Sequence, residues 1–314
     1  MIISKLQVAQ LTKQSDYLLL ALGASMLNDS APACRAAAAT CIELMLKRFP
    51  ALERNKLFDL ITTFFEDTQP VHFELAAQLS IRFVNVEGDD FKSRLTTILP
   101  LVSGKLLLLT NDIGAGRFVK IQLEHANDKT DEEKQREKDH SLIQMLNLID
   151  KITVQCESSL KNKKYINDYD EIAQQCQALL AYPHAWVRLR AAKVIHQILL
   201  AVDPQELDVV LRKKVESDRG FIFDNTEEAL RSLVLDLCAQ YTAGVSQEMA
   251  EQATAVLFQI LKLVHSLPSF KLPSKVKDED DMEGGGKVNI RWILFKLRKA
   301  CNVEVAKAPG SMNI

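Results

Sequence analysis

Residues that form turns and sheets are scarce in this chain. Its 314 residues include only 11 glycines and 9 prolines, and aromatic residues make up 6%. Glycine and proline end helices and shape tight turns, and aromatic residues are enriched in strands. Leucine, alanine, lysine and glutamate, which favour helices, are abundant instead. The composition therefore predicts an all-α protein.

Long hydrophobic runs are also missing. A membrane-spanning helix needs about 20 consecutive apolar residues, and the longest apolar-rich segment, Tyr17–Leu27, is shorter than that. The first residues lack the basic start, apolar core and small-residue cleavage site of a signal peptide. We therefore expect a soluble intracellular protein that does not bind membranes.

Positive charge is not in excess. The chain has 39 Lys and Arg residues against 41 Asp and Glu residues, a formal net charge of −2. Long-range attraction to nucleic acid needs a clear basic excess, so only a local patch could bind phosphates. None of the six cysteines shows CxxC spacing, and most occupy apolar helical positions. We expect them to be small core residues in a reducing compartment.

Complete catalytic and cofactor motifs are absent as well. Gly114-Ala115-Gly116 lacks the further glycine of a dinucleotide fingerprint, and Gly104-Lys105 lacks the glycine loop and the following Ser or Thr of a phosphate-binding loop. GxSxG and kinase-type motifs do not occur. No close pair of histidines brackets a carboxylate. We expect no enzyme activity, no cofactor, no metal ion and no small-molecule substrate.

The chain does contain a recurring amphipathic pattern. In PHAWVRLRAAKVIHQIL, Pro183–Leu199, apolar residues follow Val187 at i+4, i+7, i+8 and i+11, and Val202 continues the pattern at i+15. The same pattern recurs on the segments that contain Cys34, Phe73 and Leu230, and equivalent positions lie 39, 114 and 39 residues apart. Since 114 is three times 38, the spacing predicts an α-solenoid of HEAT or armadillo-like helix pairs. Unrelated amphipathic helices that align by chance are the alternative.

The periodicity also predicts where individual helices lie. Pro100 is expected to break or kink its helix, and Asn225–Glu228 resembles a capping box. Besides the helix that contains Cys34, the expected helices are Asp16–Leu27, Leu52–Phe65, Phe73–Val84, Phe91–Leu109, His140–Leu160, Tyr169–Leu180, Ala185–Val202, Thr226–Tyr241, Ser246–Ser266 and Arg291–Cys301.

Two polar segments divide the chain. Residues 111–139 are expected to form a charged loop or insertion, because DKTDEEKQREKD has no apolar stripe; an exposed loop and a solvated helix both fit. Residues 269–289, with the run DEDDMEGGG, are expected to be an acidic, glycine-rich disordered linker. HEAT-like repeats are expected over 1–110 and 140–268. A C-terminal amphipathic helix and tail, 290–314, is expected to fold back onto them.

Two arginines follow the first apolar position of their pattern, Arg35 and Arg188. In a helical array such arginines usually pair with acids between repeats, and an RNA phosphate contact is the alternative. A better candidate for RNA contact is the cluster of Lys161, Lys163 and Lys164, although lysines also suit a solvated helix C-terminus.

Further structural positions lie beside Val187. Trp186 is expected to be a buried anchor of its helix pair, and Trp292 to belong to the amphipathic face of the terminal helix. His184 is expected to cap the helix that starts at Ala185, or to pack beside Trp186, rather than to titrate or bind a metal.

Three segments resemble a known family. PHAWVRLRAAKVI, DHSLIQMLNLIDKI over Asp139–Ile152 and IRWILFKLRKACNVE over Ile290–Glu304 are similar to the C-terminal HEAT-repeat region of the down-regulated-in-metastasis family, the small-subunit processome component 20 proteins. The strongest marks are the His-Ala-Trp-Val-Arg run and the Trp-Ile-Leu-Phe-Lys-Leu run. Members of this family are very large, so the chain would correspond to a terminal part of a longer protein.

The resemblance implies a function as well as a fold. It implies a non-enzymatic scaffold of the nucleus and nucleolus, in the small-subunit processome that processes pre-ribosomal RNA to 18S rRNA and builds the small ribosomal subunit. The implied partners are processome proteins and pre-ribosomal or small nucleolar RNA, bound directly or through other proteins. A generic HEAT-repeat adaptor in protein transport or signalling is the alternative that fits the repeat pattern alone.

Overall fold

The computed structural model describes residues 5–28, 30–67, 69–110, 130–205, 227–241, 246–267 and 290–307. Within these ranges the chain forms helices and turns and contains no strand, so the prediction of an all-α protein is confirmed. None of the described helices is long and apolar enough to cross a membrane. The expected linker 269–289, residue Asn225 of the expected capping box and most of 111–139 lie outside the described residues.

The chain divides into two compact units. The first consists of Met1–Asp112 and Arg117–Ser159, and the second of Ile113–Gly116 and Leu160–Ile314. The helices of unit 1 are α1 Val8–Thr12, α2 Ser15–Asn28, α3 Pro32–Arg48, α4 Ala51–Glu66, α5 Pro70–Glu87, the 3₁₀ helix η1 Gly88–Arg94, α6 Leu95–Thr110 and α7 Asp131–Gln155. Unit 2 begins within the 3₁₀ helix η2 Glu157–Lys161 and contains α8 Ile166–Leu179, α9 Ala185–Leu200, α11 Glu227–Ala239, α12 Gln247–Ser266 and α14 Ile290–Lys307.

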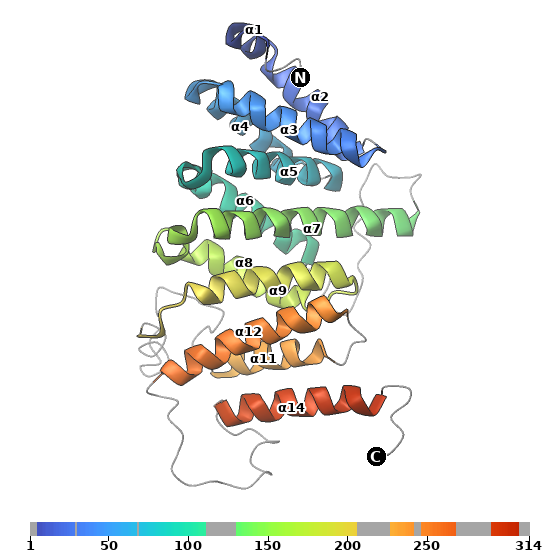
Figure 1. Ribbon diagram of the computed structural model, residues 1–314, viewed down its shortest axis with the longest axis vertical. Coiled ribbons are helices and arrows are strands. Elements are labelled where there is room, and N and C mark those ends of the chain that lie inside the picture. Colours follow the sequence, from blue (N-terminus) through green and yellow to red (C-terminus); the bar gives the residue numbers. More distant parts are fainter. Residues whose placement is uncertain are drawn as a thin grey trace. The chain divides into compact units, whose positions relative to one another are not determined.

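In unit 1 each helix from α2 to α7 contacts one of its neighbours in the chain and a helix two positions away. The helices α3, α5 and α7 pack side by side, and α2, α4 and α6 pack in a second series behind them (Figure 1). The pairs α2 with α3, α4 with α5 and α6 with α7 connect the two series. Unit 1 therefore consists of helix pairs stacked in two layers.

Unit 2 is built from fewer described helices. The helix α9 packs against α8 and α12, and α12 packs against α11. The terminal helix α14 contacts both α11 and α12 (Figure 1), so the C-terminal amphipathic segment does fold back onto its neighbours.

The repeated apolar pattern forms the buried faces of four of these helices. In α9 the side chains of Val187, Ala191, Val194, Ile195 and Ile198 are at most 2% exposed. The equivalent faces of α3, α5 and α11 are mostly buried as well; Cys34 is exposed, and Cys41, Ile81 and Tyr241 are half-buried. Full burial of one aliphatic side chain is worth about 1.5–3 kcal/mol, so these faces hold the helices in place.

The helix around Pro100 differs from the expectation. Phe91 belongs to η1, and α6 begins at Leu95 and continues through Pro100 to Thr110, so the expected break is wrong. Proline removes the hydrogen bond that its own N–H would make to the carbonyl of Thr96, and its ring crowds that carbonyl. Ile98, Leu99 and Val102 around it are fully buried, and their packing holds the helix together across that missing bond.

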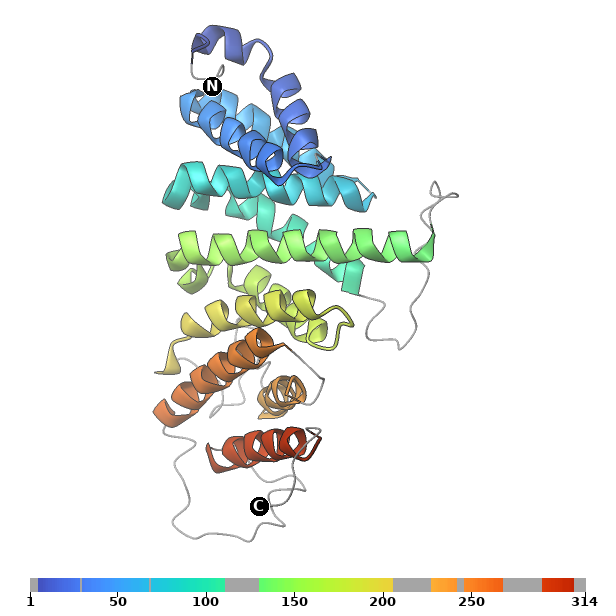
Figure 2. The same ribbon diagram turned by 45° about the vertical axis from the view of Figure 1, so that its right-hand side comes forward.

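The long helix α7 starts inside the segment expected to interrupt the repeats. Thr130 caps it, because its hydroxyl accepts from the Glu133 N–H at 3.2 Å while the Glu133 carboxylate accepts from the Thr130 N–H at 2.9 Å. Acidic residues in the first turn also favour the positive end of the helix dipole. Of the two alternatives, a solvated helix is therefore correct for 131–139. Figure 2 shows this end of α7 extending beyond the end of α5.

Candidate functional site

The two tryptophans have opposite environments. Trp186 is 52% exposed in the first turn of α9, so the prediction that it is a buried anchor is wrong. The fully buried Val187 follows it, and successive helical residues point about 100° apart, which turns Trp186 toward solvent. Trp292 in α14 is 2% exposed, with the guanidinium carbon of Arg231 4.9 Å from the centre of its ring.

His184 stands at the N-cap of α9 but does not cap it with its side chain. Its backbone carbonyl accepts from the N–H groups of Val187 at 3.1 Å and Arg188 at 3.3 Å. The expected side-chain cap is therefore wrong, and the first turn is closed by the backbone.

Arg35 and Arg188 hold the turn before their own helix. The Arg35 guanidinium donates to the carbonyl of Ser30 at 3.2 Å, and Arg188 donates to the carbonyls of Tyr182 and Pro183 at 2.8 Å each. Among the residues that the structure describes, Arg188 forms no ion pair with an acid, so the expected ladder between repeats is wrong for this residue. The two equivalent arginines therefore share a local structural role.

Polar contacts between stacked helices of unit 1 come from other residues. Arg82 on α5 contacts Glu43 on α3 at 3.0 Å, and Arg94 contacts Asn55 on α4 at 3.0 Å. The Lys105 ammonium on α6 donates to the carbonyl of Asp67 at 3.0 Å. These three contacts join residues 39, 39 and 38 positions apart.

A buried carboxylate lies at the C-terminal end of α5. Glu87, whose side chain is 7% exposed, accepts two hydrogen bonds of 2.7 Å from Arg94 and lies 3.3 Å from Arg54. The Arg94 guanidinium also covers the ring of Phe58, 4.5 Å from its centre. Paired, planar contacts of this kind fix the end of α5 against α4 and η1.

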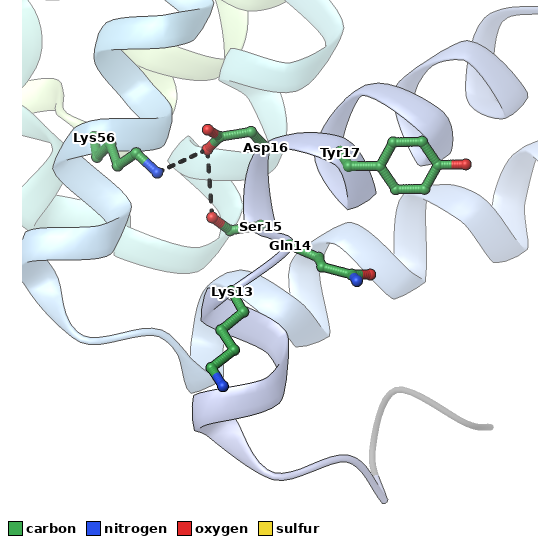
Figure 3. Close-up of a pocket in the computed structure, with 6 residues that line it drawn as sticks. All are labelled: Lys13, Gln14, Ser15, Asp16, Tyr17 and Lys56. Atoms are coloured by element: carbon green, nitrogen blue, oxygen red, sulfur yellow. Dashed lines mark hydrogen bonds and ion pairs between the residues drawn. The ribbon is translucent and has the colours of Figure 1, made fainter.

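A hollow of about 470 Å³ lies where α1 meets α2 (Figure 3). Two lysines line it, Lys13 and Lys56. Lys56 lies 3.2 Å from Asp16 and 3.8 Å from Glu53, and the hydrogen bond to Asp16 raises the pKa of Lys56. Figure 3 shows Lys56 directed at Asp16, and Tyr17 directed away from both. The charge of Lys56 is therefore already balanced by two acids.

Three of the six cysteines are buried, as expected, and three are not. Burial raises the pKa of the Cys156 and Cys238 thiols to about 11, and it raises that of Cys176 as well. These thiols stay protonated near neutral pH and are poor nucleophiles. Cys34 and Cys301 are exposed and Cys41 is half-buried, so the prediction of core cysteines fails for them.

The lysines predicted as an RNA patch lie together on one turn. Lys161 ends η2, and Lys163 and Lys164 follow in the turn before α8; all three are exposed. The Lys164 ammonium lies 5.4 Å from the centre of the Tyr165 ring. The patch is compact, but it spans only four residues.

Neither a metal site nor a match to a protein-family model indicates a function for the described part of the chain. Within the described ranges, no group of three His, Cys, Asp or Glu side chains could hold a metal ion. No protein-family model matches the chain. The features that remain are the stacked helices and their exposed faces.

Proposed function

We propose that the chain is part of a HEAT-type α-solenoid that serves as a non-enzymatic scaffold in the small-subunit processome. The observation that carries the solenoid is the offset of the polar contacts in unit 1. Hydrogen bonds between stacked helices join residues 38, 39 and 42 positions apart. This offset agrees with the period near 38 in the sequence and is what a chain of helix pairs produces when each pair packs on the next.

Unit 2 supports the same arrangement with a longer offset. Gln177 contacts Asp236 at 2.9 Å, Gln240 contacts the carbonyl of Leu180 at 2.9 Å, and Gln259 contacts the carbonyl of Leu199 at 3.4 Å. These pairs are 59 or 60 positions apart. Residues 206–226, between α9 and α11, account for most of the additional length.

The assignment to ribosome assembly rests on the resemblance of three segments to the processome component 20 family. The residues of two of these segments have structural roles here. Arg188 of the His-Ala-Trp-Val-Arg run holds the turn before α9, and Trp292 and Ile293 of the terminal run are buried. A scaffold of this kind would act in the nucleolus by holding processome proteins and pre-ribosomal RNA along its surface.

Crosslinking of the tagged chain in living cells tests this proposal. The attached RNA is sequenced, the co-purified proteins are identified, and the tag expressed alone is the control. We expect enrichment of processome proteins, with pre-ribosomal or U-three small nucleolar RNA bound directly or through them. Enrichment of neither, together with cytoplasmic transport or signalling partners, would overturn the proposal in favour of a generic adaptor.

A further inference from the structure

Two neighbouring helices of unit 2 expose aromatic and cationic side chains. The helices α9 and α12 contact each other and lie side by side in Figures 1 and 2. The Gln259 side chain on α12 donates to the carbonyl of Leu199 on α9 at 3.4 Å, which sets their register. Their solvent-facing sides therefore adjoin.

The exposed side of α9 is a regular stripe. Starting from Trp186, its members recur at i+4, i+7, i+11 and i+14, on the side away from Val187 and Ala191. They are Trp186, Arg190, Lys193, Gln197 and Leu200. The two ends of the stripe are exposed, Trp186 at 52% and Leu200 at 50%, and Arg190, Lys193 and Gln197 between them are half-buried.

The exposed side of α12 has the same periodicity. Its members are Glu251, Thr254, Phe258, Lys262 and His265, all of them exposed. Phe258 is 58% exposed, and the Lys262 ammonium lies 4.7 Å from the centre of its ring. Burial and the nearby charge of Lys262 both lower the pKa of His196 on α9, which places this lysine next to α9.

Positive charge on these two stripes is largely unopposed. Helix α9 carries three cations and no acidic residue, and the two acids of α12, Glu248 and Glu251, lie near its start. From Gln252 to Ser266, α12 carries Lys262 and no acid. Within the described ranges, none of the ion pairs involves Arg190, Lys193 or Lys262.

We propose that this α9–α12 face binds single-stranded RNA. The rings of Trp186 and Phe258 stack on bases, and Arg190, Lys193 and Lys262 contact phosphates. Exposed aromatic rings beside cations suit single strands, whose bases are free to stack, whereas a duplex hides the faces of its bases. From Trp186 to Leu199 the helix rises about 20 Å, enough for several nucleotides. Which RNA occupies this face in the cell depends on the proposed function. The capacity to bind a single strand depends only on the side chains described above.

Intrinsic fluorescence of the full chain is a direct test. The chain has two tryptophans, and Trp292 is only 2% exposed, so stacking of a base should quench mainly Trp186. A Trp292→Phe variant leaves Trp186 as the only tryptophan. Titration with a mixed-sequence single-stranded RNA of about 12 nucleotides should give saturable quenching that weakens with salt.

Substitutions locate the binding face. Trp186→Ala and Phe258→Ala should each weaken binding about tenfold, measured by fluorescence anisotropy of labelled RNA. Lys193→Gln and Lys262→Gln should each reduce the slope of log affinity against log salt by about 1. Two controls should leave affinity unchanged: Leu235→Ala, which changes a 42% exposed apolar residue on α11, and the triple change of Lys161, Lys163 and Lys164 to Gln.

Three results would overturn the inference. The first is that the protein shows no saturable RNA binding at low salt. The second is that the Trp186→Ala and Phe258→Ala variants, with unchanged circular dichroism, bind RNA as tightly as the unmodified protein. The third is that only the triple-lysine variant loses binding. Polyglutamate that quenches Trp186 and displaces the RNA equally well would instead identify a surface for acidic protein segments. Binding in vitro without processome partners in cells would refute the proposed function and leave this face intact.

Discussion

At the scale of single residues, unit 1 depends most on the buried carboxylate of Glu87. A carboxylate removed from water is tolerated because Arg94 donates two hydrogen bonds to it and Arg54 lies 3.3 Å away. Arg94 also packs on the rings of Phe58 and Phe83. Removal of Arg94 takes away both hydrogen bonds and leaves the carboxylate with the ion pair to Arg54 at 3.3 Å. The pair is therefore more important than the exposed pair Arg136–Glu132, at 3.8 Å.

Arg94→Ala should lower the free energy of unfolding by about 3 to 5 kcal/mol, because Glu87 stays buried and loses its paired donors. Urea denaturation followed by circular dichroism measures the change. Arg136→Ala is the matched control and should change stability by less than about 0.5 kcal/mol. Similar effects of the two substitutions would show that Glu87 is not a buried centre.

The tryptophans give a second contrast between residues. Trp292→Ala should lower the free energy of unfolding by about 3 to 5 kcal/mol through lost burial and a cavity. Trp186→Ala should cost less than about 1 kcal/mol, because half of that side chain is already in water. Thermal unfolding of both variants measures the difference, and a larger effect of Trp186→Ala would contradict the exposed position.

Buried thiols make stability depend on pH. In the unfolded chain a cysteine ionises near 9.0, whereas burial raises the pKa of Cys156 and Cys238 to about 11 in the folded protein. The folded state therefore keeps its protons over a range where the unfolded state loses them. Stability should be full below about pH 9 and should fall as the pH rises from 9 toward 11.

The midpoint of urea unfolding at several pH values tests this dependence. A variant with Cys156→Ala and Cys238→Ala should lose part of the decline between pH 9 and 11. In the native protein a thiol reagent should modify the exposed Cys34 and Cys301 before the buried cysteines. Early modification of Cys176 would contradict its burial.

At the scale of elements, two helices show how local signals and packing compete. Helix α7 starts where a capping box and three acids favour it, although its first turns have no apolar face to bury. Helix α6 continues through Pro100 although the local sequence disfavours it, because its buried face holds it together. The first is decided by local chemistry and the second by tertiary packing.

Pro100→Ala should stabilise the protein by about 1 to 3 kcal/mol, because alanine restores the missing backbone hydrogen bond and favours helix. Pro100 is exposed, so the change removes no buried side chain. Thermal unfolding measures the gain. A loss of stability would mean that the proline ring is needed for the conformation of α6.

Thr130→Ala should loosen the start of α7 by about 1 kcal/mol through loss of the cap. Hydrogen exchange of the backbone amides in the first turns of α7 should become faster, while exchange near Leu146 in its buried half should not change. Thr130→Ser, which keeps the hydroxyl, is the control. Equal exchange in both variants would show that the cap does not stabilise this end.

At the scale of the whole molecule, charge restricts where RNA can bind. The formal net charge is −2, so no general attraction to polyanions is expected. Duplex RNA should therefore bind much more weakly than a single strand of the same length at equal salt, because it cannot use the stacking side chains. Gel-shift or anisotropy titrations with the two forms measure the ratio, and equal affinity would argue for phosphate contacts alone.

Local periodicity by itself determined the helical class and the buried faces. Val187, Ala191 and Val194 are apolar at helical spacing, and such a helix must bury that side wherever it packs. The capping box of Thr130 and Glu133 is also a local signal in the sequence. The charged residues around it favoured the interpretation of this segment as a loop or insertion. Signals of this kind lie within one or two helical turns.

Only the tertiary structure decided which exposed side chains lie together. Helical periodicity does not predict whether another helix packs over Trp186, and the side chain of this tryptophan is half exposed. The contact of Arg82 with Glu43 joins residues 39 positions apart, and that of Gln259 with Leu199 joins residues 60 positions apart. Such pairs depend on how helices stack, and no local pattern specifies that. The α9–α12 face became visible for this reason only after the helices were placed.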